Sequence, residues 1–487
     1  MNGEARYDAV VIGAGVGGLV AASLLARARR SVLLLEAQDA PGGACRASEA
    51  LGGAVSLCGP SAVDARVVKT LRLARRGLKL ARRPAAVAAL RPDGRRLLID
   101  GEGRAPRRAI AAQSLADAGA IAAHRAELAR LGRRLSPLWL ERAGARGEAD
   151  DDPLLARLKV TSAAAVLNAR FESEAVKTAL AFDAPSPFDS GSAMALVWRA
   201  AEAMGRQGGA AAIAEGGAAT LAQALADAAL SFGVELRLQA KAAELILADG
   251  AVVGVALDSG ERIFARAVLS SLSRRTTLLK LCPTARAGLA ETFALIDAAP
   301  VCGEASIGFL LNGPAGLGGG DVPAGARFVL ADRLDSFAAA ASAARAGRLP
   351  DDLILEAASP SAIEPSVAPQ GRHVLIVRAR CLPVHPAEGW AKASTALIAG
   401  ALAALERHAP NLRARIVGVD LALPDGEADA DGGPARLLAS YDERIATPIE
   451  GLFLCGAGAE PMNDLLGRAA RLAASIALDW LAKGSAS

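Results

Sequence analysis

A glycine-rich turn between a buried strand and a helix constrains this chain more than any other feature. The apolar run Asp8–Ile12 predicts a buried strand, Gly13–Gly18 follows at once, and Leu19–Ala26 has helical composition. A second apolar run, Ser31–Leu35, ends at Glu36. Strand, glycine turn, helix, second strand and acid, in this order, are typical of a βαβ unit that binds a dinucleotide. A lone glycine pattern is weak evidence, but here the whole context is present.

Each of these residues has a physical task in such a unit. Gly13 permits the tight turn, Gly15 has no Cβ and lets the backbone approach a pyrophosphate, and Gly18 lets the helix pack closely on the strand. The unpaired N–H groups and the positive dipole end at the helix N-terminus favour phosphate. Glu36 stands where an acidic side chain accepts hydrogen bonds from ribose hydroxyls, and its charge would repel a 2′-phosphate. FAD or NAD is therefore expected, rather than NADP.

The whole chain narrows the function classes further. Its 487 residues predict two or three lobes, and an apolar content of 52% supplies a sizeable core. A net charge of +4 with only 3% aromatic residues does not favour nucleic-acid binding. No apolar run approaches the roughly 18 residues that a membrane-spanning helix needs. The apolar N-terminal stretch encodes the phosphate turn rather than a secretion signal, so a cytoplasmic protein is expected.

Six cysteines and four histidines are scattered without a CxxC pair or a metal-ligand spacing. Buried, reduced thiols in a cytosolic protein are the simplest interpretation. Cys45 and Cys58 flank the predicted cofactor region, so a redox dithiol is an alternative, although disulfide reductases use closer cysteines. No metal site and no catalytic side chain is predicted.

A second organised block extends the dinucleotide-binding unit. An Asp249-Gly250 turn signals a hairpin. The expected elements are a helix over 218–230, strands over 234–239, 242–247, 252–258 and 262–269, and, near the C-terminus, a strand over 451–456 followed by a helix over 465–482. An inserted group of strands of this kind is typical of large FAD-binding folds rather than of simple NAD dehydrogenases.

Four separated segments together resemble one family, the phytoene-desaturase-like FAD oxidoreductases. These segments are the N-terminal fingerprint through Gly42-Gly43, Phe171–Ala181, 215–281 and Gly451–Pro461, and Ser359–His373 also resembles a family signature. The resemblance implies an α/β fold in which a Rossmann-type, glutathione-reductase-like FAD-binding domain carries an inserted α+β substrate domain. The FAD-binding domain is expected over residues 1–75, 205–285 and 440–487, and the substrate-binding domain over 76–204 and 286–439.

The same resemblance implies which residues lie along the FAD. They are Gly13, Gly15, Gly17, Gly18, Glu36, Ala37, Gly42, Gly43, Ala242, Gly456, Ala457, Leu465 and Leu466. Gly42 and Gly43 would pass near the ribityl chain or a phosphate, and Ala242 would flank the adenine. Gly456, Gly458 and Ala459 would approach the ribityl chain. The start of the final helix near Leu465 would face the pyrimidine edge, where its dipole stabilises negative charge on the reduced flavin.

The resemblance further implies redox chemistry on an apolar small molecule, often a polyene or other alkene. A desaturase or saturase-like reaction of this kind is carried by the flavin rather than by side chains. Two alternatives stay open. Met462–Asp464 replaces the family's His-Pro and glycines, which would suit a catalytically degenerate scaffold; Asp464 would there either oppose a reduced flavin anion or cap the final helix. An amine-oxidase-like flavoenzyme shares the N-terminal elements, but Ala44 follows the glycine pair where an arginine is common.

An arginine-rich stretch over 66–108 allows two interpretations. Its charges either solvate helix and hairpin faces, or they form a patch that contacts anionic lipid at a membrane surface. An enzyme that takes an apolar substrate from lipid would need such a peripheral contact.

Overall fold

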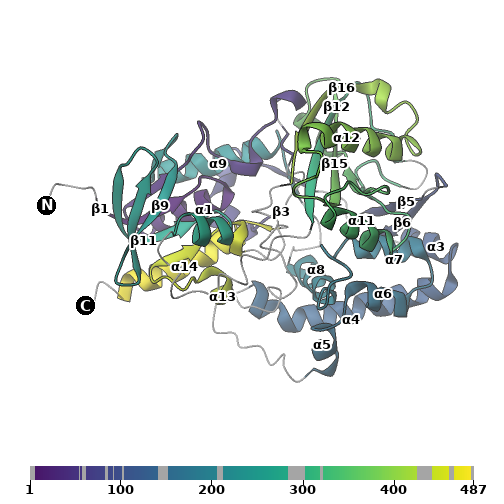
Figure 1. Ribbon diagram of the computed structural model, residues 1–487, viewed down its shortest axis with the longest axis horizontal. Helices are drawn as coiled ribbons and strands as arrows, with labels where there is room; N and C mark the ends of the chain where they lie inside the picture. The colour runs from purple at the N-terminus through teal and green to yellow at the C-terminus, as the bar shows by residue number, and fades with distance from the viewer. Residues whose placement is uncertain are drawn as a thin grey trace.

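The computed structural model describes residues 6–53, 55–57, 62–82, 86–91, 93–100, 104–140, 152–205, 212–282, 302–318, 322–424, 441–459 and 465–483. Two large sheets dominate this part of the chain, and each is covered by helices (Figure 1). The first and last described elements of the chain, β1 and α14, both belong to the lobe of the first sheet. The second sheet and a layer of helices form the other lobe.

The first sheet combines a parallel core with an antiparallel extension. Its strands are β1 (Arg6–Ile12), β2 (Val32–Leu35), β8 (Glu235–Arg237), β9 (Ala242–Ala248), β10 (Ala251–Leu257), β11 (Arg262–Ser270) and β17 (Leu452–Leu454). Strands β8, β2, β1, β11 and β17 pair in parallel, and β10 and β9 continue antiparallel from β11. Asp249 and Gly250 both have positive φ, as the predicted hairpin turn requires. The Rossmann-type α/β fold expected from the sequence is confirmed.

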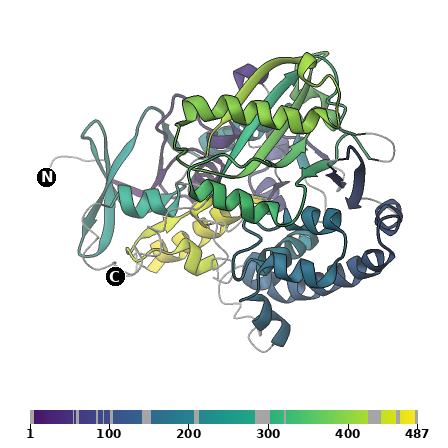
Figure 2. The same ribbon diagram turned by 45° about the vertical axis from the view of Figure 1, so that its right-hand side comes forward.

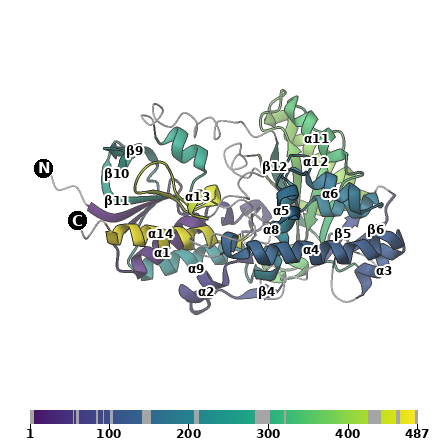
Figure 3. The same cartoon turned by 90° about the horizontal axis from the view of Figure 1, so that it is seen from below.

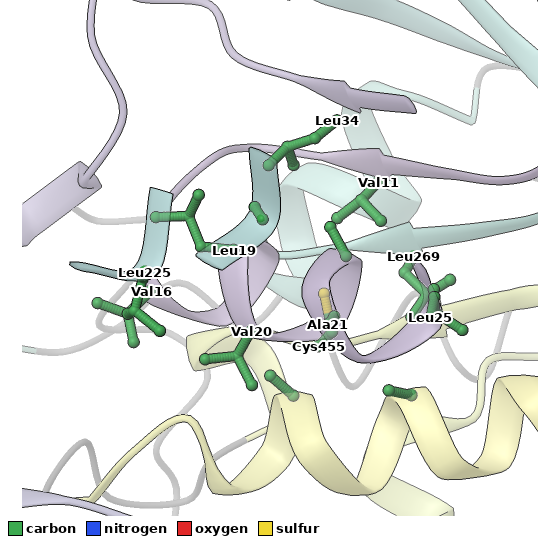
Figure 4. Close-up of a cluster of buried hydrophobic side chains, with 14 of the residues drawn as sticks. Val11, Val16, Leu19, Val20, Ala21, Leu25, Leu34, Leu225, Leu269 and Cys455 are labelled. Atoms are coloured by element: carbon green, nitrogen blue, oxygen red, sulfur yellow. The ribbon is translucent and has the colours of Figure 1, made fainter. Parts of the chain in front are cut away.

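The central strands are apolar throughout because both faces of the sheet are covered. Val11 and Leu34 pack under α1 (Val16–Arg27), α9 (Ala218–Ser231) and α14 (Arg468–Lys483). Val10 and Leu33 face the opposite cluster, to which β9 and β10 contribute. Figure 3 shows these helices on one side of the parallel strands and the antiparallel strands β9 and β10 on the other. In Figure 4, α1 lies between the strands and α14, and Val20 points toward α14.

The second sheet is larger in residues and mainly antiparallel. Its strand order is β16 (Ile416–Ala422), β12 (Gly303–Leu311), β15 (His373–Leu382), β14 (Ile354–Ala358), β13 (Arg327–Leu330), β5 (Val87–Leu90) and β6 (Arg96–Asp100). Only the β13–β5 pair is parallel. Strands β5 and β6 pair antiparallel, and the N–H of Arg91 donates a hydrogen bond to the carbonyl oxygen of Arg95 just beyond their ends.

Helices cover both faces of this sheet as well. One face packs under α12 (Trp390–Glu406). The other face meets a helical layer of α3 (Ala105–Ala111), α4 (Leu115–Leu140), α6 (Ala163–Arg170), α7 (Glu174–Ala181), α8 (Ala193–Gly205) and α11 (Ser336–Arg345). Figure 2 shows α12 and the helical layer on opposite sides of the strands. No helix among the described residues is long and apolar enough to cross a bilayer.

Three short helices follow one another before α8: α5 (Pro153–Leu158), then α6, which Ser162 caps, and α7, which Ser173 precedes. One sequence expectation about a helix needs correction. The final helix begins at Arg468 rather than Leu465, because Leu465–Leu466 form strand β18, which pairs in parallel with β3 (Ala62–Val63). Gly467 then turns the chain with φ +87°.

The strands of the first sheet come from the segments expected to form the FAD-binding domain, and those of the second sheet come from the segments expected to form the substrate-binding domain. The domain boundaries themselves remain a prediction. An antiparallel ribbon of β4 (Leu80–Arg82) and β7 (Ala212–Ala214) lies where the chain passes between the lobes. Residues expected in the FAD-binding domain also reach the second sheet: Leu51 and Val55 pack in one cluster with Val374 and Ile376.

Candidate cofactor site

The glycine turn after β1 has the geometry that its sequence predicted. Gly13 has φ +87°, which a side chain would strain. A Cβ on Gly18 would lie 1.8 Å from the carbonyl oxygen of Gly13, so α1 packs on the end of β1 only with glycine at this position. A Cβ on Gly15, by contrast, would meet no atom closer than the Cα of Gly43 at 4.0 Å. A ligand can therefore come close to the backbone at Gly15.

The second glycine pair closes against the first turn. The N–H of Gly42 donates a 2.8 Å hydrogen bond to the carbonyl oxygen of Ala14, and Gly15 and Gly42 form an isolated parallel bridge. A Cβ on Gly43 would lie 3.1 Å from the Cα of Gly15. Gly42 and Gly43 have φ of +121° and +53°. Two segments that are distant in the sequence thus form one backbone-lined cradle at the N-terminus of α1, where N–H groups suit phosphate oxygens.

Glu36 is buried at the end of β2 and points back to this turn. Its Oε2 accepts a 2.7 Å hydrogen bond from the N–H of Ala14, and its Oε1 accepts a 2.9 Å bond from the N–H of Gln38. Only 8% of the residue is exposed. Each carboxylate oxygen can accept a second hydrogen bond, so the side chain is fixed and still able to receive ribose hydroxyls. Ala37, also expected at the cofactor, is exposed beside it.

The chain after β17 lies against the same turn. A Cβ on Gly17 would lie 2.5 Å from the carbonyl oxygen of Cys455, and one on Gly456 would lie 2.0 Å from that of Ser271. The missing side chain of Gly17 therefore lets α1 pack against residues 455–456. It does not leave space for a ligand at this position. Ala457–Ala459 form a short 3-10 turn in which the N–H of Ala459 donates to the carbonyl oxygen of Gly456.

Ser271 holds these segments together, and sequence reasoning missed it. Its hydroxyl lies 2.9 Å from the carbonyl oxygens of both Ile12 and Gly13, directly behind the glycine turn. Its N–H donates to Ile12 as well. Its position in the sequence, directly after a predicted strand, could have indicated it, because functional residues gather beyond the carboxyl ends of parallel strands.

Ala242 and the Leu465–Leu466 pair lie at the ends of the candidate site. The N–H of Ala240, two residues before Ala242, donates to the carbonyl oxygen of Glu36, so the start of β9 lies next to the acid. Leu465–Leu466 belong to β18, and the expectation that they begin the last helix is wrong. The helix end at Arg468 is nonetheless close to α1, because a Cβ on Gly467 would lie 3.4 Å from Val20.

Several expectations fall on residues outside the described ranges. These are the altered loop Met462–Asp464 with Glu460 and Pro461, and Cys58 of the alternative dithiol. Its partner Cys45 is 3% exposed in the turn after Gly43. Burial raises the pKa of the Cys455 thiol well above its usual range, which suits a structural thiol.

The residues present fit a dinucleotide. Glycine backbone lines the cradle where a Cβ would fill it, an uncapped helix start supplies N–H donors, and a fixed carboxylate stands at the end of β2. The groups that the described residues contribute to this cradle are thus backbone amides and a carboxylate, which suit a cofactor that carries the reaction itself.

Comparison with known proteins identifies a flavin-dependent family. The family model described as flavin-containing amine oxidoreductase matches residues 16–302. The rat (Rattus norvegicus) pyridine nucleotide-disulfide oxidoreductase domain-containing protein 2 is 27% identical over 97% of this chain and 93% of its own length. Shorter matches are to hydroxyneurosporene desaturase of Cereibacter sphaeroides, 49% identical over 59 residues and 12% of each chain, and to the chloroplastic prolycopene isomerase of Arabidopsis thaliana, 57% identical over 42 residues, 9% of this chain and 7% of that protein.

Solved structures share the fold. An oxidoreductase from Methanosarcina mazei matches with a TM-score of 0.67 at 17% identity, over 98% of this chain and 100% of that one. Cyclohexylamine oxidase from Brevibacterium oxydans IH-35A matches with a TM-score of 0.65 at 18% identity, over 98% and 99%. The resemblance to phytoene-desaturase-like FAD oxidoreductases that the sequence suggested is confirmed.

Proposed function

Because the chain belongs to the flavin-containing amine oxidoreductase family, we propose that it is an FAD-dependent oxidoreductase of the desaturase or saturase type that acts on an apolar small molecule. FAD as cofactor and oxidoreduction as reaction class follow from the family. The apolar substrate and the desaturase-like reaction are the proposed part.

The observation that carries the proposal is the local identity to a desaturase. The chain is 49% identical to hydroxyneurosporene desaturase over 59 residues, which are 12% of this chain. The match to prolycopene isomerase, 57% over 42 residues, supports the same substrate class. Both names describe enzymes of long conjugated polyenes, so we propose a polyene or another alkene as substrate.

The residues of this chain have binding and positioning roles in that reaction. When bound, FAD supplies the site that accepts or donates a hydride or electron pair. Gly15 and Gly43 let the pyrophosphate approach backbone, the start of α1 presents N–H donors to it, and Glu36 accepts the ribose hydroxyls. Ser271 keeps the glycine turn and Gly456 in register with each other.

An amine-oxidase-like activity is the second candidate, and the family description supports it. The residue after the glycine pair argues against it, because Ala44 stands where amine oxidases commonly have arginine. The nearest arginine in this turn, Arg46, is instead paired with Asp39 at 3.0 Å on the surface. The hypothesis of a catalytically degenerate scaffold is based only on the altered loop over 462–464. A turnover measurement decides whether it is correct.

We further propose that the protein meets its substrate at a membrane surface. Exposed basic residues gather on α2 (Ala65–Thr70) and the following turn Leu73–Arg76, and they are Arg66, Lys69, Arg72 and Arg75. Leu80 next to them is 38% exposed. Each basic residue near an anionic leaflet contributes about 1 kcal/mol to binding.

Two measurements test the proposed function. Purified protein should be yellow, and its flavin absorbance should bleach with dithionite. FAD-loaded protein is then incubated anaerobically with polyenes of differing saturation and, separately, with a panel of primary amines. Bleaching of the oxidised flavin by a polyene, or reoxidation of dithionite-reduced flavin by one, supports the proposal, because a desaturase reduces the flavin and a saturase oxidises it. Bleaching by an amine, followed by hydrogen peroxide release in air, would favour the second candidate, and silence with both classes would favour the scaffold.

Vesicle flotation tests the membrane contact. Binding to vesicles that contain phosphatidylserine should fall when Arg72 and Arg75 are changed to glutamate. The matched control is the pair K392E and R413E, two exposed basic residues of the second lobe outside the arginine-rich stretch. Equal binding to neutral and anionic vesicles would contradict the proposal.

A further inference from the structure

Two cysteines of the second lobe, Cys302 and Cys381, pack at the same cluster of side chains, one at the start of β12 and the other at the end of β15. Cys302 directly precedes β12, and Cys381 is the next-to-last residue of β15. They lie 79 positions apart in the sequence, and no cysteine spacing marks them as a pair. The antiparallel pairing of the two strands brings them together.

A β-bulge sets the direction of Cys381. The strand register passes from Gly303 opposite Leu382 to Ala305 opposite Ala379, so Arg380 and Cys381 together oppose Glu304. Cys381 has φ +56°, a left-handed backbone conformation that glycine usually supplies in bulges of the G1 type.

Because of the bulge, the side chains of Arg380 and Cys381, which are neighbours in the sequence, lie on the same face of the sheet. Ala379 and Leu382 belong to the apolar cluster under α12, whereas Cys381 belongs to the cluster formed with the helical layer. Cys302 packs against that same cluster from the start of β12. Successive side chains of a regular strand point to opposite faces. Without the bulge, Cys381 would therefore lie on the face under α12, opposite to Arg380.

The two thiols differ in environment as an attacking and a resolving thiol do. Cys302 is half-buried, and the hydrogen bond from Cys381 together with nearby Arg345 lowers its pKa below the usual range, although burial and Asp189 act in the opposite direction. Cys381 is 7% exposed, and its pKa is raised by the hydrogen bond to Cys302 and by burial, with Glu304 adding to this and Arg380 opposing it. Of the two thiols, the more accessible one, Cys302, is therefore the one that loses its proton more readily.

We propose that Cys302 and Cys381 form an oxidisable dithiol that reacts with a hydroperoxide and closes to a disulfide. In the first step the Cys302 thiolate attacks one peroxide oxygen, the O–O bond breaks, and water or an alcohol leaves after taking a proton. In the second step the sulfur of Cys381 attacks the resulting sulfenic acid, an S–S bond forms, and water leaves. The two thiols lose two electrons and the peroxide is reduced by two.

Peptide mapping after peroxide treatment tests the proposal on the whole FAD-loaded protein. Trypsin cleaves after Arg380, so Cys381 is released within residues 381–392, while Cys302 is released within residues 287–327. Treatment with hydrogen peroxide and alkylation of remaining thiols should yield these two peptides joined and two hydrogens lighter. The thiols titrated in denaturant should fall by two from six, and dithiothreitol should restore them.

Single variants separate this dithiol from unspecific oxidation. In Cys381→Ser, Cys302 should stop at the sulfenic acid and be labelled by dimedone. In Cys302→Ser, residue 381 should stay a free thiol under the same peroxide dose. Cys455→Ser is the control, because Cys455 is fully buried, and it should leave the joined peptide unchanged. Absence of the joined peptide in wild type, or equal peroxide reactivity of Cys302 and Cys455, would overturn the proposal. The wild-type peptide map decides the matter even if a variant fails to fold.

Discussion

The backbone N–H of Ala14 donates a 2.7 Å hydrogen bond to Oε2 of Glu36. The bond joins the glycine turn after β1 to the acid at the end of β2, two features that are adjacent only because their strands pair. It fixes one carboxylate oxygen at the cradle, while the N–H of Gln38 fixes the other.

Glu36→Gln should weaken FAD binding. The amide keeps one acceptor oxygen but turns an N–H₂ group toward either a backbone N–H or a ribose hydroxyl, so the ribose loses a charged acceptor, at a cost of about 1–3 kcal/mol. That cost corresponds to a loss of affinity of about fivefold to somewhat over a hundredfold. Titration of the apoprotein with FAD, followed by flavin fluorescence, measures it. Asp258→Asn, an exposed change on the loop after β10, is the control and should leave the affinity unchanged.

Gly18→Ala should destabilise the protein, whereas Gly119→Ala should stabilise it. A Cβ at Gly18 would lie 1.8 Å from the carbonyl oxygen of Gly13, so α1 would have to move off β1. Overpacking of this kind costs about 1–3 kcal/mol or more. Gly119 is exposed inside α4 with no atom within 4 Å of the added carbon, and glycine there costs about 0.5–1 kcal/mol relative to alanine. Urea unfolding measures both, and equal effects would contradict the packing role of Gly18.

Stability should fall as pH decreases from about 6.5 to about 4 because of His124. Burial, followed by the charge of Arg170, lowers the pKa of His124 to about 4 in the folded protein. Its Nδ1 lies 3.0 Å from the Arg170 guanidinium, which favours the neutral ring. Between the two pKa values the unfolded chain takes up a proton that the folded protein does not, so up to about 3 kcal/mol is lost on acidification, and the loss levels off below the folded pKa.

The His124→Gln variant checks this pH dependence. Its unfolding free energy should be flatter than that of wild type between pH 7.5 and pH 4.5. His385→Gln, at an exposed position, should keep the wild-type slope. If the His124→Gln variant retains the full slope, another group causes it.

Glu356→Gln should cost far more stability than Glu388→Gln. Glu356 is nearly buried between Arg327 and Arg380, at 3.3 Å and 3.0 Å; burial acts to raise the pKa of its carboxyl, but these charges hold that pKa well below the usual range. Removing one partner of a buried pair costs about 3–5 kcal/mol. Glu388 pairs with Lys392 on the surface at 3.0 Å, and such pairs contribute under about 1 kcal/mol. Comparable losses in urea unfolding would contradict the assignment.

The sequence by itself determined what depends on neighbouring residues. Gly13 to Glu36 specified a strand, a tight turn, a helix and an acid, because each of these is decided by local backbone preference and by the period of apolar residues. The Asp249-Gly250 hairpin followed in the same way. The family resemblance supplied the cofactor and the order of the segments.

Only the tertiary structure decided which distant segments meet, because strand pairing and close backbone contacts leave no local pattern. The contact of Gly17 with Cys455 and Gly456, the bonds of Ser271 to the glycine turn, and the pairing of Leu465–Leu466 with Ala62–Val63 all arise in this way. The pairing of Cys302 with Cys381 depends on one extra residue in β15, since a single-residue shift in a strand moves a side chain to the other face.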